Sequence, residues 1–377
     1  MIITNVNLVL PNEVVKGSVE VIDGEIRSMS NTLSQLPQAI DGNDGFLMPG
    51  LIELHTDNLE KYFAPRPKVD WPPLSAMKAH DTQLIGAGIT TVLNALALGD
   101  HRGKLRHEIL DQQINTVVQS QKNGTNRVDH RLHLRCEVPH NTTVEIFERY
   151  INTPGVQLVS LMDHAPGQRQ FVNIEKYRTY YQGKYGYNDA QMAEFESQQR
   201  EYSERWSAPN REEICGQCRS RNIPMASHDD ATQAHAEESK DLGMVIAEFP
   251  TTMEAAKASR DLGLHVLMGA PNVIRGGSHS GNIAAHELAT AGALDILSSD
   301  YYPVSLLDAI FTLAHDPRNK LTLADAVKLA TFNPAQSLQL HDRGVIEEGK
   351  RADLLLTHYQ HGQAYIDSVW REGKKVF

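Results

Sequence analysis

The chain has 377 residues, 41% of them hydrophobic and 22% charged, an ordinary globular composition that excludes wholesale disorder and collagen-like repeats. Lys and Arg number 36 against 47 Asp and Glu, and a net charge of −11 disfavours nucleic-acid binding, which needs a cationic surface. No apolar run reaches the roughly 20 residues of a membrane helix, the first residues lack a signal-peptide pattern and three cysteines cannot form a disulfide framework. We therefore expect a cytoplasmic protein that binds neither membrane nor nucleic acid.

Both ends of the chain show strand patterns. Short β-branched runs occupy residues 2–10, 19–22 and 26–29, and the Asp23–Gly24 pair between the last two is a hairpin signal. Strand patterns return near the end of the sequence. Because chain ends often lie close together, we expect residues 1–48 and 344–377 to pair into one small β-sandwich domain.

Between these ends, short apolar runs alternate with helical patterns. Such alternation is typical of parallel βα units, and eight units predict a (β/α)8 barrel, a TIM-like fold, over residues 49–343. The eight predicted strands are residues 51–57, 90–97, 130–138, 156–164, 224–230, 244–250, 265–271 and 295–300.

One connection, residues 165–223, is much longer than the 2–6 residues usual for a βα loop. It contains a polar helix pattern over residues 189–206 and a run rich in Tyr, Lys and Arg over 176–187. Two interpretations stay open: a lid that contacts substrate, or a helical hairpin that decorates the barrel rim.

Imidazoles and carboxylates occur where the predicted strands end. In a (β/α)8 barrel the active site lies at this end, and residues i and i+2 of a strand share a face. This mixed ligand set suits Zn, Mn or Fe. Six side chains are too many for one tetrahedral ion and suit two divalent ions about 3.5–4 Å apart, bridged by Glu137 and a hydroxide. The predicted ligands are His55, Asp57, Glu137, His164, His228 and Asp300. The competing interpretation is that such residues only cap helices and contact solvent.

A glycine-rich loop, residues 276–281, follows the seventh predicted strand. With Arg275, Ser278 and His279 it forms a pattern that binds phosphates or carboxylates through backbone N–H groups. The Cys215–Cys218 pair lies in a helical pattern without a second pair, which disfavours a zinc ribbon or a redox role.

At the two junctions between barrel and β-domain the sequence resembles the amidohydrolase superfamily. Residues 49–55, PGLIELH, are similar to its PG-x-ID-x-H opening, and residues 344–354, GVIEEGKRADL, to its closing segment. It departs from the superfamily in having His55-Thr-Asp57 for the usual His-x-His, and Glu137 where many members use a carboxylated Lys.

More specific runs resemble the diphosphatases of the carbon–phosphorus lyase pathway of phosphonate catabolism. These runs are residues 51–71, 133–137, 162–171, 227–232 and 269–282. The resemblance implies a metal-dependent hydrolase that releases diphosphate from α-D-ribose 1-methylphosphonate 5-triphosphate, a phosphorylated sugar phosphonate.

The positions of several cations agree with an anionic substrate, because Arg and Lys bind phosphoryl oxygens. They follow or end predicted strands at Lys61, Arg66, Lys68, Arg135, Arg169 and Arg275. We assign Asp300 as the general base, which accepts the proton that the attacking water loses when it becomes hydroxide. Two alternatives remain: an amidohydrolase acting on a cyclic amide or N-acyl substrate, and a non-catalytic scaffold of the same fold. The native metal is left open, with zinc the first choice, as is a homo-oligomeric state.

Overall fold

The computed structural model describes residues 1–66, 68–99, 104–278 and 281–377, without the side chains of residues 104–108. The chain divides into two compact units. Unit 1 comprises residues 1–94, 112–131 and 268–377, and unit 2 comprises residues 95–111 and 132–267.

The sheet predicted for the barrel has eight strands in the order β13-β12-β11-β10-β9-β8-β7-β6, and its strand pairs within each unit are parallel. Each predicted run overlaps one strand, which confirms the TIM-like barrel class. The strands are β6 Leu51–Thr56, β7 Ile89–Leu98, β8 Asp129–Glu137, β9 Val156–Met162, β10 Met225–His228, β11 Ile246–Glu248, β12 His265–Gly269 and β13 Ile296–Ser298. Every residue of β6, β10, β11 and β13 is buried, as expected for a parallel sheet covered on both faces.

Helices follow these strands. Before β11 they are α1 Asn58–Phe63, α2 Pro73–Gly86, α3 Lys104–Lys122, α4 Thr143–Tyr150, α5 Ile174–Tyr185, α6 Asp189–Ser220 and α7 Gln233–Asp241. After β11 they are α8 Met253–Asp261, α9 Ala270–Arg275, α10 Ala285–Thr290, α11 Ser305–His315, α12 Leu323–Lys328 and α13 Phe332–Ser337.

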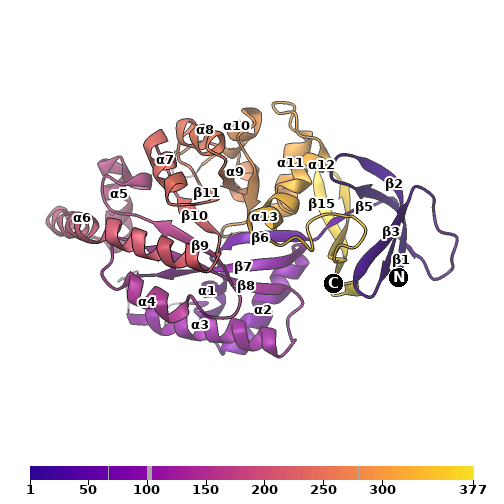
Figure 1. Ribbon diagram of the computed structural model, residues 1–377, viewed down its shortest axis with the longest axis horizontal. Coiled ribbons are helices and arrows are strands. Elements are labelled where there is room, and N and C mark those ends of the chain that lie inside the picture. The colour runs from indigo at the N-terminus through magenta and orange to yellow at the C-terminus, as the bar shows by residue number, and fades with distance from the viewer. Residues whose placement is uncertain (67, 100–103, 279–280) are drawn as a thin grey trace. The chain divides into compact units, whose positions relative to one another are not determined.

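The two chain ends share a second, mixed sheet within unit 1, in the order β16-β15-β14-β5-β1-β2-β3, with β4 paired to β1 (Figure 1). Its core includes Ile3, Leu47, Leu354 and the fully buried Trp370. A separate sheet built from both chain ends is what the strand patterns predicted, and its standing as a β-sandwich domain of residues 1–48 and 344–377 stays a prediction. Its strands are β1 Ile2–Val9, β2 Val14–Ile22, β3 Glu25–Ser30, β4 Ile40–Asp41, β5 Phe46–Pro49, β14 Leu354–Gln360, β15 Gln363–Arg371 and β16 Lys374–Lys375.

In unit 2 two successive βα units repeat at a spacing of 20 residues. Thr232 and Thr252 cap α7 and α8, each side chain accepting a backbone N–H three residues on. Each helix gives way to a glycine with positive φ, Gly243 at 87° and Gly263 at 82°, a conformation that glycine adopts at little cost. The capping residues explain why both helices begin and end at equivalent positions.

The long connection after β9 folds as a short 3₁₀ turn, Arg169–Phe171, followed by α5 and α6. The helix predicted over residues 189–206 continues to Ser220 and contains Pro209, which normally breaks a helix. It continues because flanking side chains anchor it: Ser207 donates to Asp163 at 2.7 Å, and the Asn210 amide donates to the carbonyls of Val138 and His140. None of the helices in the described ranges is both long and apolar enough to cross a membrane.

Unit 1 also contains a buried chain of polar side chains on α2, β7 and β8. The Asp81 carboxylate lies 3.2 Å from His130 Nε2, and Asn94 lies between His130 Nδ1 at 3.3 Å and His80 Nε2 at 3.0 Å. His80 is fully buried, so desolvation, together with the nearby His130, lowers its pKa to about 3. The folded protein therefore holds His80 neutral, whereas the unfolded chain protonates it near pH 6.5.

The pKa of His80 is lower in the folded state than in the unfolded chain. The contribution of neutral His80 to the stability of the fold is therefore complete above pH 6.5 and is lost as the pH falls toward 3, because the unfolded chain then binds a proton that the folded protein does not. Between pH 7.5 and 5 this group should lower the free energy of unfolding by about 2 kcal/mol, at about 1.36 kcal/mol per pH unit. Urea unfolding of the wild type and of His80→Asn at both pH values measures this term, and the variant should lose about 2 kcal/mol less. Equal losses in both proteins would contradict it.

Candidate metal centre

In unit 1 the ends of β6 and β13 bring three predicted ligands together. His55, Asp57 and Asp300 each offer a ligand atom, and these atoms lie within 4.8 Å of one another. The backbone holds them there: Thr56 forms an isolated parallel bridge with Asp300, and the Asp57 N–H donates to the Asp300 carbonyl at 3.3 Å. His55 is buried, and the two carboxylates are half-buried. This set can hold one cation through an imidazole and two carboxylates.

In unit 2 a second set forms at the ends of β9 and β10. Ligand atoms of His164, His228 and Asp229 also lie within 4.8 Å of one another. Asp229 Oδ2 is 3.6 Å from His164 Nε2 and 3.4 Å from His228 Nε2. The six predicted ligands thus fall into two groups, one in each unit, and their convergence on one point stays a prediction.

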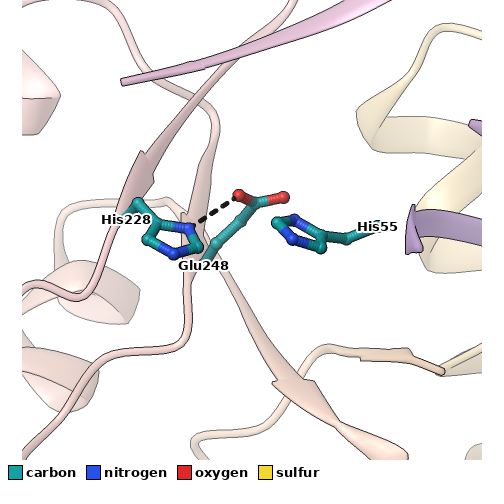
Figure 2. Close-up of side chains that lie close together, drawn as sticks. All are labelled: His55, His228 and Glu248. Carbon is teal, nitrogen blue, oxygen red and sulfur yellow. Dashed lines mark hydrogen bonds and ion pairs between the residues drawn. The ribbon is translucent and has the colours of Figure 1, made fainter. Parts of the chain in front are cut away.

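A carboxylate contacts the other ring nitrogen of each of the two histidines in this group. Glu137 Oε1, at the end of β8, lies 2.6 Å from His164 Nδ1. Glu248 Oε2, at the end of β11, lies 3.2 Å from His228 Nδ1, and Figure 2 shows these two groups facing each other across the dashed contact. Such contacts fix the orientation of an imidazole and increase its strength as a ligand.

The charges around His164 are those of a metal site. Burial alone would lower the pKa of His164, but the carboxylates of Glu137 and Asp229 raise it to about 10. Burial opposes ionisation of Asp229 as well, yet His228 and His164 lower its pKa. A cation in the group would take the place of the proton on His164, because a histidine ligand must be neutral.

One atom tests whether a cation fits this group. Among the described residues, Asp229 Oδ2 is a buried oxygen that has no hydrogen-bond partner, and two imidazole Nε2 atoms face it. A buried carboxylate oxygen without a donor is costly, whereas coordination to a divalent ion satisfies it. The residues present therefore fit a metal ion.

The predicted substrate-binding residues of unit 1 lie on the helices and loops that follow β6 and β12. Lys61, Arg66, Lys68 and Arg275 are exposed, and Ser278 is half-buried. Lys61 Nζ contacts Asn58 Oδ1 at 2.9 Å and the Tyr301 carbonyl at 3.0 Å, so it connects helix α1, which follows β6, to the segment after β13. Arg275 ends helix α9, which follows β12 where a loop was predicted. His279 lies outside the described residues.

The two predicted substrate arginines of unit 2 differ. Arg135 is half-buried on β8, and its charge lowers the pKa of Asp229. Arg169 is 4% exposed and forms ion pairs with Asp230 and, at 2.6 Å, Glu238. The prediction that Arg169 contacts substrate therefore loses its basis, because a buried guanidinium paired with two carboxylates holds the protein together instead.

Sequence reasoning missed three carboxylates of these groups: Glu53, Asp229 and Glu248. Glu248 and Glu53 were detectable in principle, since each is the first charged residue in an apolar strand run. Asp229 directly follows His228, but only the fold shows that it, rather than its neighbour Asp230, lies against the histidines.

The fold is shared with proteins of known structure. The model of the Amidohydrolase family matches residues 211–376. Among solved structures, N-acetylglucosamine-6-phosphate deacetylase from Thermotoga maritima aligns with a TM-score of 0.60 and 15% identity, over 100% of this chain and 99% of that one. N-isopropylammelide isopropylaminohydrolase from Burkholderia multivorans aligns with a TM-score of 0.63 and 16% identity, over 100% and 97%. At such identities these structures establish the fold alone.

A curated relative is much more similar. Alpha-D-ribose 1-methylphosphonate 5-triphosphate diphosphatase from Escherichia coli (strain K12) is 63% identical over 378 aligned positions, covering 100% of both chains. The chain belongs to the amidohydrolase family and, within it, to the group of this diphosphatase.

The buried pair of Arg169 and Asp230 gives a prediction about stability. Asp230 is 1% exposed, and its other partners are the hydroxyls of Ser227 and Ser239. Arg169→Met leaves a buried carboxylate without its cation, which should cost about 3–5 kcal/mol in the free energy of unfolding. Arg169→Met/Asp230→Asn should recover a large part of that loss, measured by urea unfolding.

Arg178→Met is the matched control, because Arg178 is about half exposed and its partner Glu196 keeps a contact with Arg200. Loss of that surface pair should cost less than about 1 kcal/mol. Similar losses in Arg169→Met and Arg178→Met would show that the Arg169 pair is not a buried ion pair of the folded protein.

Proposed function

We propose that this chain is a metal-dependent hydrolase that releases diphosphate from α-D-ribose 1-methylphosphonate 5-triphosphate. The observation that carries the proposal is the 63% identity, over the whole of both chains, to a protein named as that diphosphatase. The two ligand groups at the strand ends support it, because phosphoric anhydride hydrolysis commonly uses divalent metal ions.

The proposal includes two divalent ions, with zinc the first choice and manganese or iron as alternatives. His55, Asp57 and Asp300 would hold one, and His164, His228 and Asp229, with Glu137 beside them, the other. Both groups come from carboxyl ends of strands in one sheet, the end at which barrel enzymes have their active sites. When bound, such ions lower the pKa of water toward about 7 and neutralise charge on phosphoryl oxygens.

The remaining chemistry belongs to side chains. Water attacks a phosphorus of the triphosphate, the anhydride P–O bond breaks and diphosphate leaves. Asp300 accepts the proton from the attacking water, which suits a half-buried carboxylate at the end of β13. Its backbone bridge to Thr56 fixes the position from which it does so.

Basic and polar side chains at or after the strand ends would bind the substrate, which carries a triphosphate and a phosphonate. We assign this role to Lys61, Arg66, Lys68, Arg135, Arg275, Ser278 and His279. The chain has a net charge of −11, yet it exposes basic side chains on segments that follow its barrel strands. This distribution favours an anionic ligand there.

The three cysteines are free thiols, in keeping with the reducing cytoplasm as the site of action.

The direct test uses purified protein loaded with Zn²⁺ or Mn²⁺ and the ribose triphosphate phosphonate, with nucleoside triphosphates and a hydantoin as competing substrate classes. We expect diphosphate release that a chelator abolishes. Asp300→Asn should lower kcat about 10²–10⁴-fold, the usual effect of losing a general base, while most metal is retained.

His55→Ala should instead lose metal, and measuring metal content separates the two effects. Hydantoin ring opening without diphosphate release would favour the amidohydrolase alternative. No turnover of any substrate by the metal-loaded protein would favour a non-catalytic scaffold.

Arg275 gives a prediction about the substrate's charge. An ordered charge-assisted contact to phosphate is worth about 1.5–3 kcal/mol, so Arg275→Ala should lower kcat/KM roughly 10–150-fold. Arg275→Lys should restore it only in part, because an ammonium cannot make a two-pronged contact. Steady-state kinetics of the three proteins measures this, and equal kcat/KM values would remove Arg275 from the site.

A further inference from the structure

Glu53, on strand β6, is a fully buried carboxylate that the proposed chemistry does not use. Burial raises its pKa, and hydrogen bonds to Ser298, Ser299 and His55 oppose that shift. A buried carboxyl group is retained only where strong partners satisfy it, so its contacts indicate what it does.

Those contacts join β6 to β13. Glu53 Oε1 accepts the backbone N–H of His55 at 2.6 Å, and Oε2 accepts the backbone N–H of Ser299. The Ser298 hydroxyl lies 2.6 Å from Oε1. One carboxyl group therefore holds the backbone immediately before Asp300 and the backbone of His55.

These two strands are the first and the last of the barrel, and they form little backbone ladder. In β6 the Ile52 N–H donates to the Ala330 carbonyl, and in β13 the Leu297 N–H donates to the Leu329 carbonyl. Both strands therefore form these backbone hydrogen bonds with the segment between α12 and α13 rather than with each other. In the described part of the chain, the backbone bridge between them is Thr56 with Asp300. The Glu53 side chain supplies acceptors where the ladder is missing.

Ser298 extends the contact to both ends of the ligand group. Its hydroxyl oxygen is 2.7 Å from the His55 carbonyl and accepts the Asp300 N–H at 3.3 Å. His55 is thus connected to the Glu53 carboxyl group by one hydrogen bond, and Asp300 is connected to it by two, through Ser298. Ser298 and Glu53 are 245 positions apart in sequence.

We propose that Glu53 is a positioning residue that closes the seam between β6 and β13 and thereby sets the geometry of His55, Asp57 and Asp300 as a cation site. The inference rests on the proposed function in that these three residues hold a metal ion. Glu53 itself contacts neither the ion nor the substrate.

Glu53→Gln is the decisive change, since it keeps the shape of the side chain. The Gln amide has one oxygen and one NH₂ group, so a donor would face the N–H of either His55 or Ser299. We expect Zn²⁺ affinity at this group to fall about 10–100-fold, as when partners of metal ligands are changed. Competition of the whole protein against a chromophoric chelator measures it without any substrate.

Ser298→Ala keeps the carboxylate and both of its backbone contacts, so its loss of Zn²⁺ affinity should be smaller. His80→Asn is the matched control for general destabilisation, because it removes a fully buried polar side chain of the same unit without touching the group. It should lower Tm and leave Zn²⁺ affinity within about twofold of wild type. In turnover, Glu53→Gln should lower kcat much more than it changes KM.

The expected order of Zn²⁺ affinity is wild type and His80→Asn, then Ser298→Ala, then Glu53→Gln. Wild-type affinity in Glu53→Gln would overturn the proposal, as would an equal loss in His80→Asn at a similar fall in Tm. If the wild type released no diphosphate while Glu53→Gln still lost Zn²⁺, the proposed function would fail and the positioning role would stand.

Discussion

The repulsion among buried carboxylates is the constraint on which unit 2 depends. Five of them are at most 5% exposed and lie at or just beyond the ends of β8 to β11: Glu137, Asp163, Asp229, Asp230 and Glu248. Two like charges 4 Å apart repel by about 4 kcal/mol at an effective dielectric constant of 20. Such a cluster can fold only if each carboxylate finds a cation or a set of donors.

The long connection after β9 supplies much of that compensation. Its Arg169 pairs with Asp230, and Arg211 of α6 lies 3.6 Å from Asp163 and 3.0 Å from Glu238. A hydrophobic cluster of Phe171, Tyr177, Tyr181 and Met192 packs its first half. The base of the insertion is therefore a fixed part of the fold, because buried ion pairs are costly to separate. This disfavours a lid that opens from the base and leaves substrate contact by its exposed residues as an option.

The sequence predicted those features that depend on neighbours along the chain. Eight apolar runs and the polar residues that end them follow from local periodicity, so the barrel and five of the six members of the two ligand groups could be anticipated, Asp229 being the exception. Partnerships between distant residues could not. Arg169 follows a strand like any substrate-binding arginine, and its commitment to Glu238, 69 positions away, appears only when the chain is folded. Glu53 stands out as a charged residue in an apolar run, but its partners could not be predicted, because Ser298 and Ser299 are ordinary residues of another strand and the residue after it.

Backbone conformation completes the geometry of the strand ends. Asp229 and Phe249 directly follow β10 and β11, and Asp300 is the second residue after β13. Each has positive φ: 59°, 53° and 56°. Residues other than glycine rarely adopt this conformation, which costs of the order of 1–3 kcal/mol and persists only where surrounding contacts impose it. Contacts of that kind are present: the Asp229 N–H donates to the Glu248 carbonyl, and the Phe249 N–H donates to the Leu267 carbonyl. The Asp300 N–H donates to the Ser298 hydroxyl oxygen.

The chain thus turns sharply as each strand ends. Hydrogen bonds to neighbouring strands, or to Ser298 in the case of Asp300, fix the direction in which the last side chains point. A ligand group built in this way is set by the backbone before any ion binds, which is why changes at Glu53 or Ser298 should act on metal affinity rather than on folding alone.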